Sequence, residues 1–269
     1  MNRATRHRTP FSISLLAGIA VLFFLLPFAG LLVRVPWSDL VDIAFDPDVR
    51  RALWLSLRTS TLAAVISALL GIPLAWVLAR RRVPGRSVIR ALVTLSMVLP
   101  PVVGGVVLLF SFGRRGLFGQ FLDDWLGIRL PFTTAGVVIA QIFVAMPFLV
   151  LTVESAFRQL DPRFEDAART LGASPWFTMR HVSLPAVRSA LAAGFVLAWA
   201  RALGEFGATI TFAGNLAGTT RTMPLATYLA LETEPATALV LSLMMIIVSF
   251  TVIVGMRDRW LETPGRSTS

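Results

Sequence analysis

Residues 165–185 read EDAARTLGASPWFTMRHVSLP, a charged stretch with two prolines that lies between two strongly apolar runs. The residues around its first half predict a short helix. Asp161 can cap a helix whose first residue is Pro162. Gly172 can end that helix, because glycine adopts the left-handed conformation at a helix C-terminus without strain.

The second half of the stretch repeats the helix-start signal. Ser174 and Pro175 predict a second helix start, and Leu184-Pro185 is expected to end that helix and turn the chain into the next apolar run. In the first helix, Glu165 and Arg169 are four residues apart and are expected to form a solvent-facing pair. Because the side chains of Ala167 and Ala168 are small, another protein could approach this part of the helix closely.

The composition of the whole chain is typical of a membrane protein. Of its 269 residues 55% are hydrophobic and 15% charged, and the mean hydropathy is +0.73. A helix needs about 20 apolar residues to cross a bilayer, and six stretches qualify without the period-2 alternation of a membrane barrel. We therefore expect an all-α, polytopic fold with six transmembrane helices, at Ile13 to Val33, Leu53 to Ala79, Val88 to Phe112, Thr133 to Val153, Ala186 to Ala208 and Ala236 to Met256.

The distribution of basic residues predicts the orientation in the membrane. All 25 basic residues are arginine and the net charge is +10. Most of the arginines, among them the run from Arg80 to Arg82, fall on one side if both termini are cytoplasmic, which is the orientation that the positive-inside rule favours. Residues 1–34 then form a cytoplasmic tail and a retained first span, and residues 257–269 a cytoplasmic tail. No soluble basic face that would bind nucleic acid is evident.

The opening stretch resembles the coupling motif of ABC-transporter permeases. That motif is Glu-Ala-Ala, three residues, Gly, nine residues, an aliphatic residue, one residue and Leu-Pro. This chain matches it at Asp166, Ala167, Ala168, Gly172, Val182, Leu184 and Pro185, with Glu165 one step before the first position. Either Glu165 or Asp166 is therefore a candidate for the contact that the motif makes.

The resemblance implies a fold and a mechanical role. It implies a type I ABC importer permease in a bacterial cytoplasmic membrane, with a transmembrane domain at 53–256 and a coupling loop at 158–185 that sits in a groove of a cytoplasmic ATPase. A P-loop needs a lysine on the phosphates, and this chain contains none. ATP and Mg²⁺ are therefore expected on a partner ATPase dimer, with no cofactor or metal in this chain, and we expect the permease to pair with a second copy of itself.

A second informative region spans residues 200–225. Arg201 and Glu205 are four residues apart near the outer end of the fifth expected span, where each can neutralise the other. Thr209 and Asn215 follow among glycines, and hydroxyl and amide donors suit an oxyanion better than a metal cation. The alternative is an external or re-entrant loop in which Gly, Thr and Asn only form turns.

Three stretches resemble the molybdate branch of type I ABC permeases, which lies near the sulfate and tungstate permeases. They are GEFGATITFAGN at 204–215, TRTMPLATY at 220–228 and VLPPVVGGVVLL at 98–109. The resemblance implies import of molybdate, with sulfate or tungstate as alternatives, because all three are tetrahedral dianions. It also implies an external oxyanion-binding protein as a partner.

The third expected span carries the strongest helix break. Pro100 and Pro101 are followed by Gly104, and discontinuous helices in transporters often form the pathway or gate. The alternative is a kink that only improves packing. An ion-coupled carrier or channel is the competing functional class, whereas an intramembrane enzyme is disfavoured because no zinc motif or paired aspartates are present.

Overall fold

The computed structural model describes residues 10–80 and 83–261, and within these ranges all regular structure is helical, as the sequence predicts. Helix boundaries follow local signals: Asp46 caps the start of α3, with its Oδ1 2.8 Å from Asp48 N, and Thr133 caps α7. The helices are α1 (Phe11–Arg34), α2 (Leu40–Phe45), α3 (Pro47–Arg80), α4 (Arg86–Val98), α5 (Pro101–Phe112), α6 (Gly119–Leu126), α7 (Thr134–Gln159), α8 (Arg163–Thr170), α9 (Pro175–Thr178), the π-helix η1 (Met179–Ser183), α10 (Leu184–Ala186), α11 (Arg188–Leu203), α12 (Gly207–Ala213), α13 (Met223–Thr233) and α14 (Pro235–Leu261).

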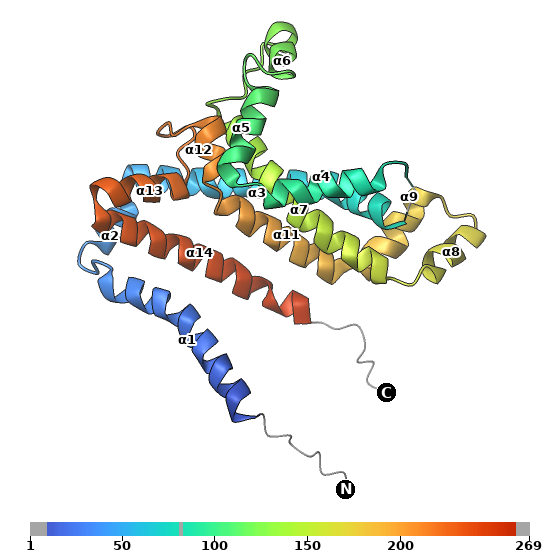
Figure 1. Ribbon diagram of the computed structural model, residues 1–269, viewed down its shortest axis with the longest axis horizontal. Helices are drawn as coiled ribbons and strands as arrows, with labels where there is room; N and C mark the ends of the chain where they lie inside the picture. Colours follow the sequence, from blue (N-terminus) through green and yellow to red (C-terminus); the bar gives the residue numbers. More distant parts are fainter. Residues whose placement is uncertain (1–9, 81–82, 262–269) are drawn as a thin grey trace.

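Four helices, α3, α7, α11 and α14, run along the long axis of the molecule (Figure 1). The centre of this bundle is α7, whose Leu149, Val153 and Phe157 are fully buried at helical spacing. Gly71 of α3 lets the neighbouring helix approach closely, since a Cβ there would lie 3.0 Å from Leu149. Gly194 of α11 meets Val153 in a similar way, and small residues at such crossings are typical of packed membrane helices.

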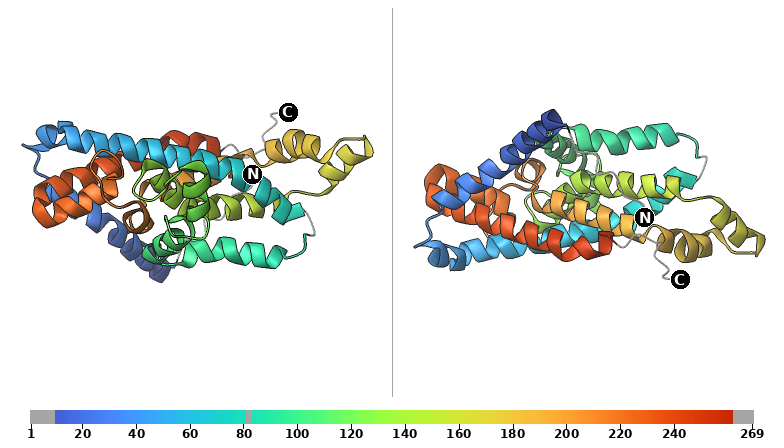
Figure 2. Two further views of the ribbon diagram at one scale, coloured as in Figure 1. Left: turned by 90° about the horizontal axis from the view of Figure 1, so that it is seen from above. Right: turned by 90° about the horizontal axis from the view of Figure 1, so that it is seen from below.

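The two ends of the bundle carry different connections. At one end, which we call the hairpin end, α8 and α9 extend beyond the long helices (Figures 1 and 2). The opposite end carries α2, α13 and the loop at 214–222. The hairpin end also holds the last turn of α3 and the first turn of α4.

Four described helices are individually long and apolar enough to cross a membrane: α1, α3, α7 and residues 235–255 of α14. A fifth candidate is α11 joined to the segment before it, although the two parts meet at 82°. The sequence predicts six spans, and that number stays a prediction. The third expected span, Val88 to Phe112, consists of α4 and α5, and α5 with 12 residues is only about 18 Å long against a core of about 30 Å.

The peripheral elements also differ from the expected simple bundle. The helix α5 and the short α6 project sideways from the long helices (Figure 1), and α12 packs against α5. No residue of the apolar part of α1 is buried in this single chain. The expected C-terminal tail at 257–269 begins as a continuation of α14, which reaches Leu261; residues 262–269 and the first nine of the N-terminal tail lie outside the described residues.

Candidate functional site

The first helix of the hairpin forms as its sequence predicts. Asp161 Oδ1 accepts a hydrogen bond from Arg163 N at 3.0 Å, and α8 begins at Arg163, one residue after the predicted Pro162. At the other end Gly172 has φ +83°, and two backbone hydrogen bonds, from Gly172 N to Arg169 O and from Ala173 N to Ala168 O, close the helix. These are the two bonds of the Schellman motif. The cap residues therefore fix where the exposed helix stops.

The second half of the hairpin is longer than the sequence predicts. Ser174 caps α9 through a 3.2 Å hydrogen bond from Phe177 N, as expected. The chain then continues through η1 and α10, past Leu184 and Pro185, and turns at Val187 rather than at the proline. A π-helix widens the turn between the hairpin and α11. It places Ser183 in the interior of the hairpin end, whereas Val182 is half-buried.

Glu165 does not face solvent, so the prediction of an exposed Glu165–Arg169 pair is wrong. The Glu165 side chain is 2% exposed, and its Oε1 accepts hydrogen bonds from Arg80 Nε at 3.0 Å and Ser183 Oγ at 2.7 Å. Arg169 does lie 3.6 Å from the other carboxylate oxygen, but from the solvent side. Partners from α3 and η1 draw this carboxylate inward.

The outward face of α8 is formed by the neighbouring residues of the motif. Asp166 is 63% exposed and bonds only with Arg169 among the interactions found in the described chain, at 3.2 Å. Ala167 is exposed and Ala168 half-buried. Four large apolar side chains of the hairpin are also exposed: Phe164, Leu171, Trp176 and Phe177. Exposed apolar groups are typical of surfaces that bind another protein or a membrane.

A second buried carboxylate lies at the hairpin end, and the sequence reasoning missed it. Glu154 of α7 is buried and forms an ion pair with Arg90 of α4. Arg86 and Arg158 also approach its Oε1, each at 4.0 Å. The only local signal is the four-residue spacing between Glu154 and Arg158, because the α4 partners lie more than 60 residues away.

The break at Pro100-Pro101 is real and lies against α12. Helix α4 ends at Val98 and α5 begins at Pro101. A Cβ on Gly207, the first residue of α12, would lie 2.7 Å from Pro101 Cβ. Gly104 is buried beside Phe143, and a Cβ on Gly105 would lie 2.9 Å from Ala208 O. Two parts of the expected pathway, far apart in the sequence, are therefore packed together.

The expected Arg201–Glu205 pair forms, with Arg201 Nη1 2.5 Å from Glu205 Oε2. Glu205 is 1% exposed, and its other oxygen accepts a 2.7 Å hydrogen bond from Ala208 N in the first turn of α12. This carboxylate therefore neutralises a charge and caps a helix at once. Both functions hold the junction of α11 and α12 in place.

The two remaining polar residues of the expected pathway have different surroundings. Thr209 is fully buried, and its hydroxyl has no hydrogen-bond partner among the described residues. Asn215 accepts a 2.9 Å hydrogen bond from Arg221 Nε and so belongs to the folded loop at 214–222. Gln141 of α7, which the sequence reasoning did not single out, is also fully buried with neither amide atom paired.

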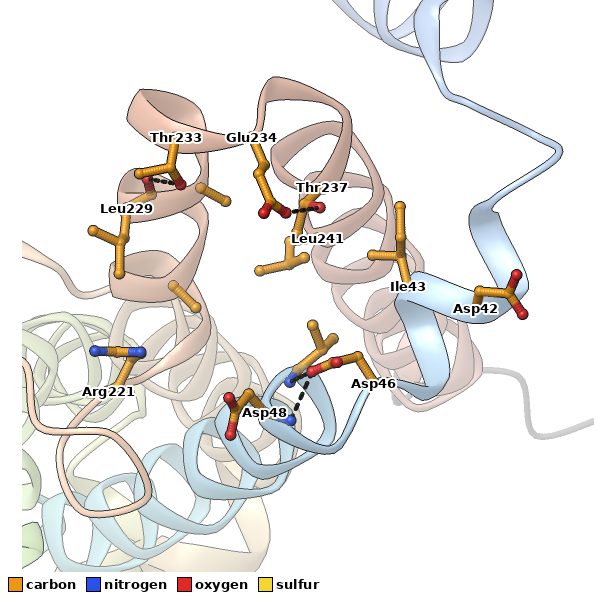
Figure 3. A pocket seen from close by; sticks show the side chains of 13 residues that line it. Asp42, Ile43, Asp46, Asp48, Arg221, Leu229, Thr233, Glu234, Thr237 and Leu241 are labelled. Carbon is orange, nitrogen blue, oxygen red and sulfur yellow. Dashed lines mark hydrogen bonds between the residues drawn. The ribbon is translucent and has the colours of Figure 1, made fainter.

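A pocket of about 550 Å³ opens at the end opposite the hairpin, between α2, the start of α3, α13 and α14 (Figure 3). Its lining includes the carboxylates Asp42, Asp46, Asp48 and Glu234, and Arg221 lies across from Asp46. Excess negative charge repels an anion, so this pocket is not an oxyanion site. No group of three or more potential metal ligands gathers within residues 10–80 and 83–261.

Comparison with known proteins gives a consistent family. Residues 70–263 match the family described as binding-protein-dependent transport system inner membrane component. The molybdenum transport system permease protein of Mycobacterium tuberculosis is 45% identical over 246 residues, which cover 91% of each chain. The Escherichia coli protein of that name is 41% identical, covering 83% of this chain and 97% of its own, and the sulfate transport system permease protein of Salmonella typhimurium is 36% identical, covering 82% of each.

Among solved structures, a bacterial ABC transporter involved in the import of the acidic polysaccharide alginate superposes with a TM-score of 0.76 at 18% identity. The match covers 95% of this chain and 96% of that one. A methionine ABC transporter gives a TM-score of 0.60 at 17% identity, and the match covers 78% of this chain and 93% of that one. These likenesses establish the fold. The chain therefore belongs to the family of inner membrane components of binding-protein-dependent transport systems, as a type I ABC permease.

Proposed function

We propose that this protein is the membrane-spanning permease subunit of an ATP-driven importer for molybdate. The observation that carries the proposal is the 45% identity with a molybdenum transport permease along 91% of both chains. Sulfate is the alternative substrate with its own support, at 35–37% identity with sulfate permeases. Tungstate remains an alternative because its oxyanion has the same shape and charge as molybdate.

The coupling loop at 158–185 is the proposed docking site for a cytoplasmic ATPase. The exposed face of α8 combines one exposed carboxylate, Asp166, which is paired only with the solvent-exposed Arg169, with small and apolar side chains. Glu165 is unsuited to the contact, since its carboxylate is already bonded to Arg80 and Ser183. We therefore assign the ATPase contact to Asp166. ATP and Mg²⁺ belong to that partner in this proposal, and this chain supplies no cofactor site.

Transport follows alternating access between the two membrane sides. Two copies of the permease present two coupling loops to two ATPase subunits, the symmetric arrangement that a single loop per chain favours. Closure of the ATPase pair moves the loops and opens the pathway outward to an external oxyanion-binding protein. Release of the hydrolysis products lets it reopen inward. The termini and the hairpin end are cytoplasmic in this scheme, because the arginine distribution favours that orientation.

The proposed pathway wall is the packed pair of α5 and α12. Pro100, Pro101 and Gly104 interrupt the span, and Arg201 and Glu205 hold the junction beside it. Thr209 brings an unpaired hydroxyl into this region, and Asn215 lies at its outer edge. Because Glu205 neutralises Arg201, the remaining polar groups of this region are hydroxyl, amide and backbone groups, with Arg221 bonded to Asn215 at the edge. Weak, neutral donors suit passage of an anion, which must also leave.

The test is uptake of labelled molybdate by cells that carry the complete transporter, with unlabelled tungstate and sulfate as competitors. The proposal expects uptake that needs the ATPase and is competed by tungstate more strongly than by sulfate. Stronger competition by sulfate would reassign the substrate. Uptake that continues when the ATPase gene is deleted would favour an ion-coupled carrier or channel and refute the proposal.

A further inference from the structure

The buried carboxylate of Glu165 joins three separate parts of the hairpin end. Its Oε1 accepts from Arg80 Nε at 3.0 Å and from Ser183 Oγ at 2.7 Å. The same Arg80 donates from Nη2 to Leu160 O at 2.8 Å. Arg80 is the last residue of α3, Leu160 directly follows α7, and Ser183 lies in the turn that leads into α11. The carboxylate on α8 is therefore bonded to the end of α3 and to the turn before α11, and through Arg80 to the residue after α7.

The position of α8 makes this connection mechanically relevant. The helix lies beyond the ends of the bundle (Figure 1), and it packs against α9 and η1. Covalent links to α7 and to α9 run through the connections at 160–162 and 171–174, which contain no helix. Connections without helix do not by themselves fix the position of α8 on the bundle. The Glu165 contacts, by contrast, join α8 directly to the bundle.

The contacts of Glu165 with Arg80 and Ser183 are of a kind that holds two helices in one relative position. Side-chain exposure is 9% for Arg80 and 2% for Glu165, and Ser183 is fully buried. Charge-assisted hydrogen bonds are directional and stronger than neutral ones, and they are screened less when buried. A buried ion pair is a poor source of net stability, since desolvation offsets the attraction. Fixing one relative placement of α8 and α3 is the function that this pair performs well.

We propose that Glu165 is a positioning residue that transmits the movement of α8 to α3 and α11, while the adjacent Asp166 contacts the ATPase. The proposal rests on the coupling function proposed above and divides it between two neighbouring carboxylates. Asp166 faces outward and determines whether the ATPase binds. Glu165 faces inward and determines whether a bound ATPase moves the membrane helices.

The experiment uses the complete transporter with the variants E165Q, R80Q, the double variant and D166N. D161N is the matched control, because it removes a carboxylate charge from the same loop while asparagine can still cap α8. For each variant, three quantities are measured: copurification of the ATPase, stimulation of ATP hydrolysis by the molybdate-loaded binding protein, and molybdate uptake. The wild-type complex must first show stimulated hydrolysis and uptake; if it shows neither, the proposed function fails, not this inference.

E165Q is expected to copurify with the ATPase within about twofold of the wild type but to lose at least about tenfold in stimulation and uptake. R80Q is expected to behave alike, and the double variant to be no worse than either single variant, because both residues act in one contact. D166N is expected to lose copurification, and D161N to resemble the wild type. Normal coupling in E165Q would overturn the proposal, and so would loss of copurification in E165Q with retention in D166N.

A second variant covers the case in which E165Q does not accumulate in the membrane. S183A removes one hydrogen bond from the carboxylate and keeps the Arg80 ion pair. It is expected to bind the ATPase normally and to reduce uptake per ATP hydrolysed by about two- to fivefold. An unchanged ratio of uptake to hydrolysis in S183A would contradict the proposed role of these contacts.

Discussion

Replacing Gly172 isolates the effect of one backbone angle on the coupling loop. The residue has φ +83°, and no atom beyond its two chain neighbours lies within 4 Å of where a Cβ would be. A new side chain therefore meets no steric obstacle, and the cost arises from the backbone alone. For an L-residue the left-handed conformation costs about 1–2 kcal/mol, more for a β-branched side chain and less for asparagine, which tolerates this region. At about 1.4 kcal/mol per tenfold, alanine at position 172 lowers the population of the correctly ended helix about five- to thirtyfold relative to other conformations of this segment.

The assay is affinity of the detergent-solubilised permease for its ATPase, measured by titration for the series Gly, Asn, Ala and Val at position 172. We expect affinity to fall in that order, with Val weakest, while membrane insertion stays normal because the apolar spans are unchanged. Loss of the two closing hydrogen bonds at the end of α8 is the cause. Equal affinity of the Gly and Val forms would refute the assignment of this helix end to the docking surface.

Three further predictions concern other parts of the molecule. G207A should weaken the packing of α12 on the broken span by about 1–3 kcal/mol, because its Cβ would lie 2.7 Å from Pro101 Cβ; an unchanged thermal midpoint of the purified permease would contradict this. E205Q should leave ATPase copurification intact but reduce molybdate uptake; unchanged uptake would make the residue purely structural. The hydrogen bond from Arg129, followed by the weaker effect of a second arginine, lowers the pKa of Asp123 in the α6 segment. The ionised Asp123 carboxylate therefore stabilises the fold above about pH 4, and this stabilisation is lost as the pH falls through the lowered pKa. D123N and the wild type should differ in thermal midpoint at pH 7 and converge in acid.

The local structure of the coupling loop could be predicted from the sequence because its signals act over a few residues. Helix starts are capped by Asp161 and Ser174, and Gly172 ends a helix, as these residue types predict. The membrane class and the helical fold followed equally well from the long apolar runs. These features need no knowledge of what lies across the fold.

The direction of Glu165 could not be predicted, because its partners are distant in the sequence. Arg80 is 85 residues away and Ser183 is 18 residues away, and the latter is placed by a π-helix that no local signal indicated. Spacing alone favoured the exposed pair with Arg169. Glu154 was missed for the same reason, since its main partner Arg90 lies on another helix.

The course of the third expected span could not be predicted from the sequence either. A run such as Val88 to Phe112 is apolar enough to cross the membrane, and hydropathy does not show that the chain changes direction at Pro100-Pro101. Contacts between α5 and α12 decide that direction, through glycines that allow backbone approach. The prolines indicated where a break would occur but not where the following helix would go.

The opposite directions of Glu165 and Asp166 can be tested directly because this chain contains no cysteine, so that single introduced cysteines can be labelled selectively. D166C and E165C are each treated with a membrane-impermeant maleimide in inside-out vesicles, with and without the bound ATPase. We expect D166C to react rapidly without the ATPase and to be protected by it, because position 166 faces outward and position 165 faces inward. E165C should react slowly in both states. Rapid labelling of E165C that the ATPase abolishes, with D166C unaffected by the ATPase, would contradict the assignment of the two carboxylates.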